Sequence, residues 1–90
     1  MRVELYATLR AAAKESGFET DPPKDVRALF EELAGRYGDG FLEGLKSEEG
    51  ELSTGVIVLV NGVNVHALEG LDTVLKAQDT VAIFPPIGGG

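Results

Sequence analysis

The chain has 90 residues, of which 43% are hydrophobic and 26% are charged, a composition typical of one small globular domain. Its net charge of −7 argues against nucleic-acid binding, which draws on clustered Lys and Arg, and the absence of Cys from the sequence excludes disulfides and thiolate chemistry within the chain. No apolar run approaches the roughly 20 residues of a membrane span and no signal peptide is visible, so we expect a cytoplasmic protein without a membrane partner.

The first part of the chain shows the pattern of a hairpin followed by a helix. Apolar and polar residues alternate over residues 2–9, which predicts a first strand. An Ala-rich helical turn at 10–15 and a short strand at 18–20 follow. Asp25 is a candidate N-cap for the one long helix. The apolar stripe of this helix consists of Val26, Leu29, Phe30, Leu33 and Tyr37.

The segment 38–55 carries five glycines and an acidic cluster of Glu48, Glu49 and Glu51. This composition predicts a long loop with one helical turn at 41–46, because it lacks the apolar pattern of a core segment. We expect the loop to be mobile and dispensable, and the alternative is a second binding site.

The second part of the chain predicts three further strands. Residues 56–60 form a continuous apolar strand, and Asn61-Gly62 is a two-residue hairpin turn that leads into a strand at 63–67. A crossover at 69–78 precedes the last strand, which ends at Phe84. This order fits the α+β class and a β-grasp fold, a mixed sheet of about five strands around one main helix, with the first and last strands parallel at its centre. We expect residues 1–90 to form a single domain with a flexible tail at 85–90.

One face of this sheet is expected to keep apolar surface that the helix cannot cover. Residues 56–60 are apolar at both parities, and Phe84 lies opposite in parity to Val81 and Ile83. An uncovered apolar face commonly marks an interface. We therefore predict a partner surface that includes Phe84, and the alternative is that the loop 38–55 folds back over it.

The last strand runs directly into a narrow tail. Pro85 and Pro86 lack the backbone N–H that a sheet ladder needs, so pairing must end there. The tail from Pro86 to Gly90 reaches roughly 15–18 Å when extended, at about 3.3–3.6 Å per residue. The reactive group at its end is the carboxylate of Gly90, which must be activated, usually as an acyl-adenylate on another enzyme, before it accepts a nucleophile. The alternative is an inert, frayed end or a cloning remnant.

Other kinds of site find no support in the sequence. His66 has no Cys and no paired carboxylates at metal-ligand spacing, so we expect no metal site and place His66 on a strand surface. The terminal glycines lack the strand-to-helix context of a phosphate loop. Without a pattern for a nucleophilic triad, we expect the chain to be no enzyme by itself.

The stretch Phe84-Pro85-Pro86-Ile87-Gly88-Gly89-Gly90 resembles the F-P-P-hydrophobic-x-Gly-Gly end of the small subunit of molybdopterin synthase and its ubiquitin-like sulfur-carrier relatives. The stretches Leu5 to Arg10 and Val60-Asn61-Gly62 resemble the family's first strand and central hairpin. Three departures are visible: Gly88 replaces a Ser or Thr, Ala77-Gln78-Asp79 stands where Asp-Gly-Asp is common, and the segment 38–55 is longer than in the shortest members.

The resemblance implies a carrier that binds no cofactor itself. An E1-like adenylyltransferase would use ATP to adenylate Gly90, and a sulfur donor such as a cysteine desulfurase or a rhodanese would convert it to a thiocarboxylate. The thiocarboxylate would supply sulfur for molybdopterin, with the catalytic residues coming from the large synthase subunit. Gly88 and Gly89 would thread into the partner. The residues expected to contact partners are Phe84, Pro85, Pro86, Ile87 and Arg10.

Three alternatives stay open at this point. The thiocarboxylate could serve a thiazole precursor or a tRNA base, although the Phe84-Pro85-Pro86 stretch favours molybdopterin. The chain could instead be a protein modifier whose Gly90 is joined to a substrate Lys. The third alternative is a β-grasp interaction module with an inert tail.

Overall fold

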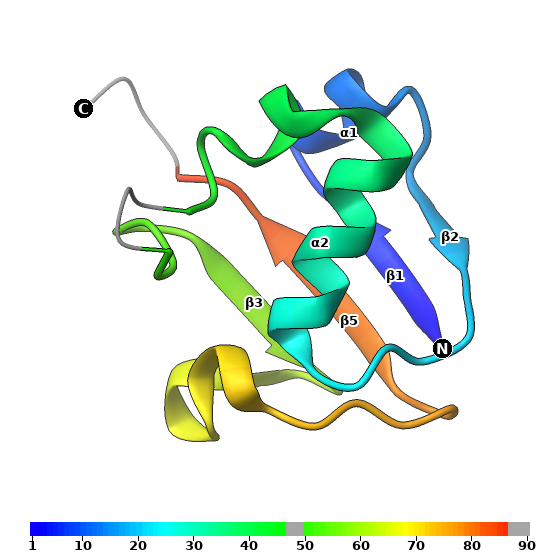
Figure 1. Cartoon of the computed structure of the whole chain (residues 1–90), viewed down its shortest axis with the longest axis vertical. Coiled ribbons are helices and arrows are strands. Elements are labelled where there is room, and N and C mark those ends of the chain that lie inside the picture. The colour runs from blue at the N-terminus through cyan, green and yellow to red at the C-terminus, as the bar shows by residue number, and fades with distance from the viewer. Residues whose placement is uncertain (47–49, 87–90) are drawn as a thin grey trace.

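The computed structural model describes residues 1–46 and 50–86. A five-stranded sheet lies behind one long helix, α2 (Val26–Tyr37), with the short helix α1 (Thr8–Ala13) at one end of the sheet (Figure 1). The strands are β1 (Arg2–Leu5), β2 (Gly17–Glu19), β3 (Ile57–Val60), β4 (Val63–Asn64) and β5 (Thr80–Phe84). Three 3-10 helices complete the fold: η1 (Asp39–Leu42), η2 (Val65–Ala67) and η3 (Gly70–Asp72).

The sheet has the order β2-β1-β5-β3-β4, which places the last strand at its centre. β5 runs parallel to β1 and antiparallel to β3, whereas the two outer pairs, β1 with β2 and β3 with β4, are antiparallel. This arrangement confirms the predicted β-grasp. No helix within residues 1–46 and 50–86 is long and apolar enough to cross a membrane.

The core lies between one face of the sheet and α2. Asp25 begins α2 as predicted, because its side chain accepts a hydrogen bond from the backbone N–H of Ala28 at 2.8 Å. The apolar stripe of α2, apart from the half-buried Tyr37, meets the inward residues of the three central strands and is removed from solvent with them. The fully buried members of this layer are Val3, Leu5, Val26, Leu29, Phe30, Leu33, Val58, Val81 and Ile83.

The first strand is shorter than the predicted 2–9. β1 ends at Leu5, and Ala7 adopts a φ of 54°, a conformation that interrupts an extended chain. The N–H of Leu9 then donates to the carbonyl of Tyr6 at 3.1 Å and closes a turn that leads into α1. Leu9 is buried as a residue of α1 and not of a strand, so the alternation that predicted a longer strand was misleading.

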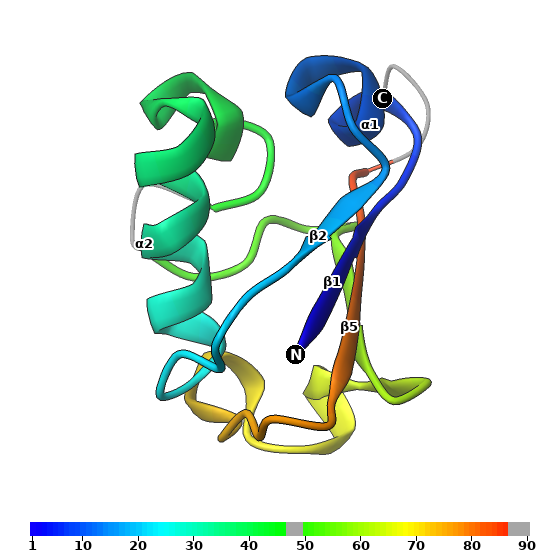
Figure 2. The same cartoon turned by 90° about the vertical axis from the view of Figure 1, so that its right-hand side faces the viewer.

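The expectation that the segment 38–55 contributes nothing to the core was wrong. Phe41, in η1, and Leu45 are buried, and Leu45 has no exposed surface. The described part of the segment lies on the same side of the sheet as α2 (Figure 2) and does not fold back over the opposite face. Leu42 and Leu52 are partly buried against the same core. Four apolar side chains scattered among glycines and acids do not show the periodic pattern of a core element.

The predicted strand at 63–67 also ends early. β4 stops at Asn64, whose side-chain oxygen accepts a hydrogen bond from the N–H of His66 at 2.9 Å and begins η2. His66 is therefore an exposed residue of a 3-10 helix and not of a strand.

The predicted Asn61-Gly62 turn is confirmed and is tied to the start of β5. Asn61 and Gly62 have φ values of 52° and 84°, as a two-residue hairpin of type I′ requires. The Asn61 amide donates to Asp79 at 2.8 Å and accepts from the N–H of Thr80 at 2.9 Å. The second carboxylate oxygen of Asp79 accepts from the N–H of Lys76 at 2.8 Å. This network holds the entry to the central strand.

Tyr37 joins the end of α2 to two neighbouring segments. Its hydroxyl donates to Glu15 at 2.6 Å, and its ring packs edge-on against Phe18 and tilted against Phe41. Burial of the phenol and, secondarily, the hydrogen bond to Glu15 raise the pKa of Tyr37 from 10.0 to about 12.

We expect Leu45→Ala to lower the free energy of unfolding by about 2–5 kcal/mol, because it removes a fully buried side chain. The matched control is Val74→Ala at a side chain that is 62% exposed, where a change within about 0.5 kcal/mol is expected. Chemical denaturation measures both. Equal stabilities of the two variants would contradict the assignment of Leu45 to the core.

We expect Tyr37 to stabilise the fold only below strongly alkaline pH. The folded state favours the neutral phenol, so this contribution is fully present below pH 10.0 and is lost as pH rises toward about 12. The stability of wild type relative to Tyr37→Phe should therefore fall over that range, as measured by denaturation at each pH. An absorbance titration of the Tyr6→Phe protein follows the Tyr37 phenol directly, and ionisation near its ordinary value would contradict the prediction.

Candidate functional site

The candidate site is the place where the central strand leaves the sheet. Phe84, the last residue of β5, is paired with Ile57 of β3, and the N–H of Tyr6 donates to the carbonyl of Ile83 at 3.2 Å. Pro85 is buried and Pro86 is exposed, and strand pairing ends at Phe84 as predicted. The chain therefore leaves the fold from a base that is held on both sides.

A stack of three side chains flanks this exit. The ring of Phe84 lies on that of Tyr6, with centroids 4.3 Å apart and planes inclined by 14°. The guanidinium carbon of Arg10 lies 5.3 Å from the centroid of the Tyr6 ring, within the range of a cation–π contact. Such contacts are worth about 0.5–1.5 kcal/mol each, so the stack keeps Phe84 and Arg10 in a defined relation.

Backbone and side-chain hydrogen bonds orient the stack. The Nε–H of Arg10 donates to the carbonyl of Leu5 at 3.2 Å, which directs the guanidinium back over the end of β1. The hydroxyl of Tyr6 donates to the carboxylate of Glu4 at 3.2 Å. Arg10 of α1 thus places a cation beside the Tyr6 ring at the end of β1.

Apolar surface surrounds the stack on the sheet face that α2 leaves open. We call this surface the outer patch; it consists of Tyr6, Ile57, Leu59, Ala82 and Phe84. Cross-strand pairing sets Ile57 beside Phe84 and Leu59 beside Ala82. Ile57 is 39% exposed, whereas its sequence neighbours Val56 and Val58 are buried on the opposite side. Among the described residues, no helix covers this face of β1, β5 and β3 (Figure 2).

Four of the residues predicted to contact partners are described by the structure, and they lie close together. Phe84 and Arg10 both contact the ring of Tyr6, and Pro85 and Pro86 continue directly from Phe84. The predicted roles of Ile87, Gly88, Gly89 and Gly90 fall outside the described residues.

Sequence reasoning missed Tyr6 as a member of this site. The alternation of residues 2–9 placed it on the face opposite the core, where an aromatic residue is unusual among charged neighbours. An aromatic residue on the predicted solvent face was the available signal. Its partner Phe84, however, lies far away in the sequence.

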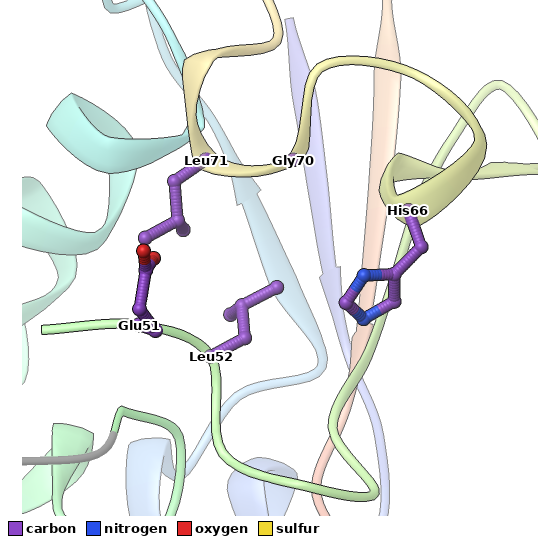
Figure 3. A pocket seen from close by; sticks show the side chains of 5 residues that line it. All are labelled: Glu51, Leu52, His66, Gly70 and Leu71. Atoms are coloured by element: carbon purple, nitrogen blue, oxygen red, sulfur yellow. The ribbon is translucent and has the colours of Figure 1, made fainter. Parts of the chain in front are cut away.

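An open pocket of about 220 Å³ lies elsewhere in the fold, between the loop before β3 and the two 3-10 helices η2 and η3. Its lining residues are Glu51, Leu52, His66, Gly70 and Leu71 (Figure 3). The Glu51 carboxylate points toward Leu71 and not toward His66. Within the described residues, no group of three or more His, Cys, Asp or Glu side chains is placed to hold a metal ion. The described residues of this pocket therefore form no metal site.

Comparison with known proteins places the chain in a family. The model of the ThiS family matches residues 3–90. A proposed sulfur carrier protein of Archaeoglobus fulgidus is 32% identical over 90 residues, which cover 100% of this chain and 98% of that protein.

Two solved structures extend the likeness to the fold. The small archaeal modifier protein 1 of Methanosarcina acetivorans superposes with a TM-score of 0.80 at 32% identity, covering 99% of this chain and 94% of the other. A chain of the BexX/CysO complex of Amycolatopsis orientalis gives a TM-score of 0.83 at 28% identity, covering 99% and 98%. The β-grasp sheet, the outer patch at the exit of β5 and the match over almost the whole length lead to one assignment: the chain belongs to the ThiS family of ubiquitin-like sulfur carriers, whose relatives include small archaeal modifiers.

Proposed function

We propose that this chain carries sulfur as a thiocarboxylate on Gly90 and delivers it for the synthesis of molybdopterin. The observation that supports this most is the exit of the central strand: β5 ends in two prolines beside an apolar patch, so a tail can reach a partner's active site while the patch docks. Family membership supports the carrier class. The choice of molybdopterin rests on the Phe84-Pro85-Pro86 stretch.

The proposed chemistry needs two steps on an E1-like adenylyltransferase. A carboxylate oxygen of Gly90 attacks the α-phosphorus of ATP, and pyrophosphate leaves. In the second step the terminal sulfur of a persulfide, formed by a donor such as a cysteine desulfurase or a rhodanese, attacks the acyl carbon, and AMP leaves with the electron pair of the broken C–O bond. Two thiols then reduce the resulting acyl disulfide to the thiocarboxylate and the donor's thiol, and are themselves oxidised to a disulfide. The product is the thiocarboxylate, which a large synthase subunit would spend as sulfide.

The chain's own residues bind and orient in this scheme. The outer patch supplies desolvated apolar contact, and Arg10 supplies a cation at its rim. In this scheme the catalytic residues belong to the partner proteins, and we assign no catalytic activity to this chain by itself. ATP is used by the activating enzyme, and the cytoplasmic location stays a prediction.

Protein modification is the second candidate function. It is favoured by the likeness to the small archaeal modifier protein 1 of Methanosarcina acetivorans over 99% of the chain. Both functions begin with the same acyl-adenylate and differ in the nucleophile, a sulfide in one case and a Lys amine in the other. Isopeptide-linked adducts in a lysate of the native host, detected by mass spectrometry, distinguish modification from sulfur delivery.

We expect Phe84→Ala to weaken binding to the large synthase subunit by about 2 kcal/mol or more, roughly thirtyfold in Kd, because a central aromatic of the patch is lost. Val74→Ala is the control, since this exposed side chain does not belong to the outer patch. Titration calorimetry measures both affinities, with circular dichroism to verify folding. A folded Phe84→Ala protein with unchanged affinity would remove the outer patch from the docking surface.

We expect the free carboxylate of Gly90 to be required for activation. One residue added after Gly90 should abolish thiocarboxylation, and Gly89→Val should block it because a narrow tunnel tolerates little beyond backbone. Gly88→Ser is the permissive control, since relatives carry a side chain at that position. After incubation with the activating enzyme, ATP and a sulfur donor, the intact mass of an accepted protein rises by the exchange of one oxygen for one sulfur. Wild-type rates in the extended or Gly89→Val protein would refute the carrier function.

A further inference from the structure

Gly55 lies against the ring of Pro86. A Cβ atom added to Gly55 would lie 3.3 Å from Cβ and 3.6 Å from Cα of Pro86, closer than ordinary van der Waals contact to the first of these atoms. The loop before β3 and the residue where the tail leaves the fold are therefore in contact. This contact lies outside the outer patch.

The contact follows from the register of the two strands. β3 and β5 are antiparallel, and Ile57 is paired with Phe84. Continued to two residues before Ile57 and two residues after Phe84, this register sets Gly55 opposite Pro86. Because Pro has no N–H, no ladder hydrogen bond is available from it. Side-chain packing on a bare glycine takes the place of the hydrogen bond.

The backbone of Gly55 is suited to this position. The N–H of Val56 donates to the carbonyl of Ser53 at 3.2 Å and closes a tight turn in which Gly55 is the third residue. Its φ of +92° is close to the value that a type II turn requires there, a conformation that side chains other than hydrogen disfavour. Both the conformation and the nearby Pro86 ring thus call for glycine.

The turn is held by the core. The N–H of Ser53 donates to the carbonyl of Leu45 at 2.9 Å, and Leu45 is fully buried. Val56, on the other side of Gly55, is 3% exposed. A turn fixed at both ends offers a firm surface, so contact with it restricts where Pro86 can lie.

We propose that Gly55 is a positioning residue for the carboxy-terminal tail. The turn 53–56 forms a contact surface for Pro86, and a Cβ atom at residue 55 would displace the Pro86 ring by a few tenths of an ångström. This surface, which we call the seat, sets the direction in which the chain leaves the sheet. The role rests on the proposed function, since the direction matters only if the tail must enter a partner's active site. The segment 38–55 then serves the tail as well as the core.

The test compares Gly55→Ala with Gly50→Ala. Gly50 has a φ of +82° and nothing within 4 Å of an added Cβ, so its variant carries the same kind of backbone strain without the contact to Pro86. In the isolated proteins, the NMR shifts of the Pro86 ring protons should change in Gly55→Ala and stay as in wild type in Gly50→Ala. Unchanged chemical shifts in both variants would contradict the proposed contact between the turn 53–56 and Pro86.

Adenylation kinetics test the role of the seat. We expect kcat with the activating enzyme to fall by about tenfold in Gly55→Ala, because misplacing a reacting group by a fraction of an ångström to an ångström slows reaction by such factors. KM should be unchanged, since the outer patch is intact, and Gly50→Ala should stay within about twofold of wild type. Equal rates in the two variants, whether both fast or both slow, would overturn the proposal.

A second variant tests whether misfolding causes the loss of kcat in Gly55→Ala. Pro86→Gly removes the ring from the other side of the contact, so adding Gly55→Ala in that background should change kcat by no more than about twofold. An undiminished effect there would attribute the loss to the turn itself and overturn the proposal. If wild type is not adenylated at all, the proposed function fails, while the comparison of ring-proton shifts still decides whether the seat exists.

Discussion

The pairing of β5 with a strand on each side is the constraint on which the rest of the molecule depends. Parallel bonding to β1 and antiparallel bonding to β3 put the last strand in the middle of the sheet, where moving it would break two ladders at once. The Asn61–Asp79 network holds its beginning and the stack on Tyr6 holds its end. A chain terminus that would ordinarily fray thus starts from the most firmly bonded part of the fold.

The same arrangement explains why an apolar patch stays open on a small acidic protein. One helix of 12 residues covers one face of the sheet, and the described part of the segment 38–55 packs on that same side. The other face keeps Ile57 at 39% exposure. A net charge of −7 opposes self-association of such a surface, so the patch can stay exposed in the absence of a partner without driving aggregation.

Features encoded by neighbouring residues could be predicted, and features that depend on distant pairs could not. The Asp25 cap, the Asn61-Gly62 turn and the end of pairing at Pro85 each follow from local chemistry. The burial of Leu45, by contrast, depends on packing with core residues that are distant in the sequence, and no window of sequence reveals such packing. The partnership of Tyr6 with Phe84 spans nearly the whole chain and needed the parallel register of β1 and β5. The predicted site was incomplete because its scaffold is non-local.

The fold separates what is common to the family from what selects a pathway. The activation that we propose needs a carboxylate at the end of a tail that leaves a rigid sheet. β5 and its two prolines suit that need whether the acceptor is a sulfur-requiring precursor or a Lys amine. Selection must then reside where the partner touches the folded part. On this chain that surface is the outer patch with Arg10 at its rim. Charged groups at the rim of an interface set partner choice more than apolar area does, so an acidic group beside the Arg10 guanidinium is the complement that we expect on a cognate partner.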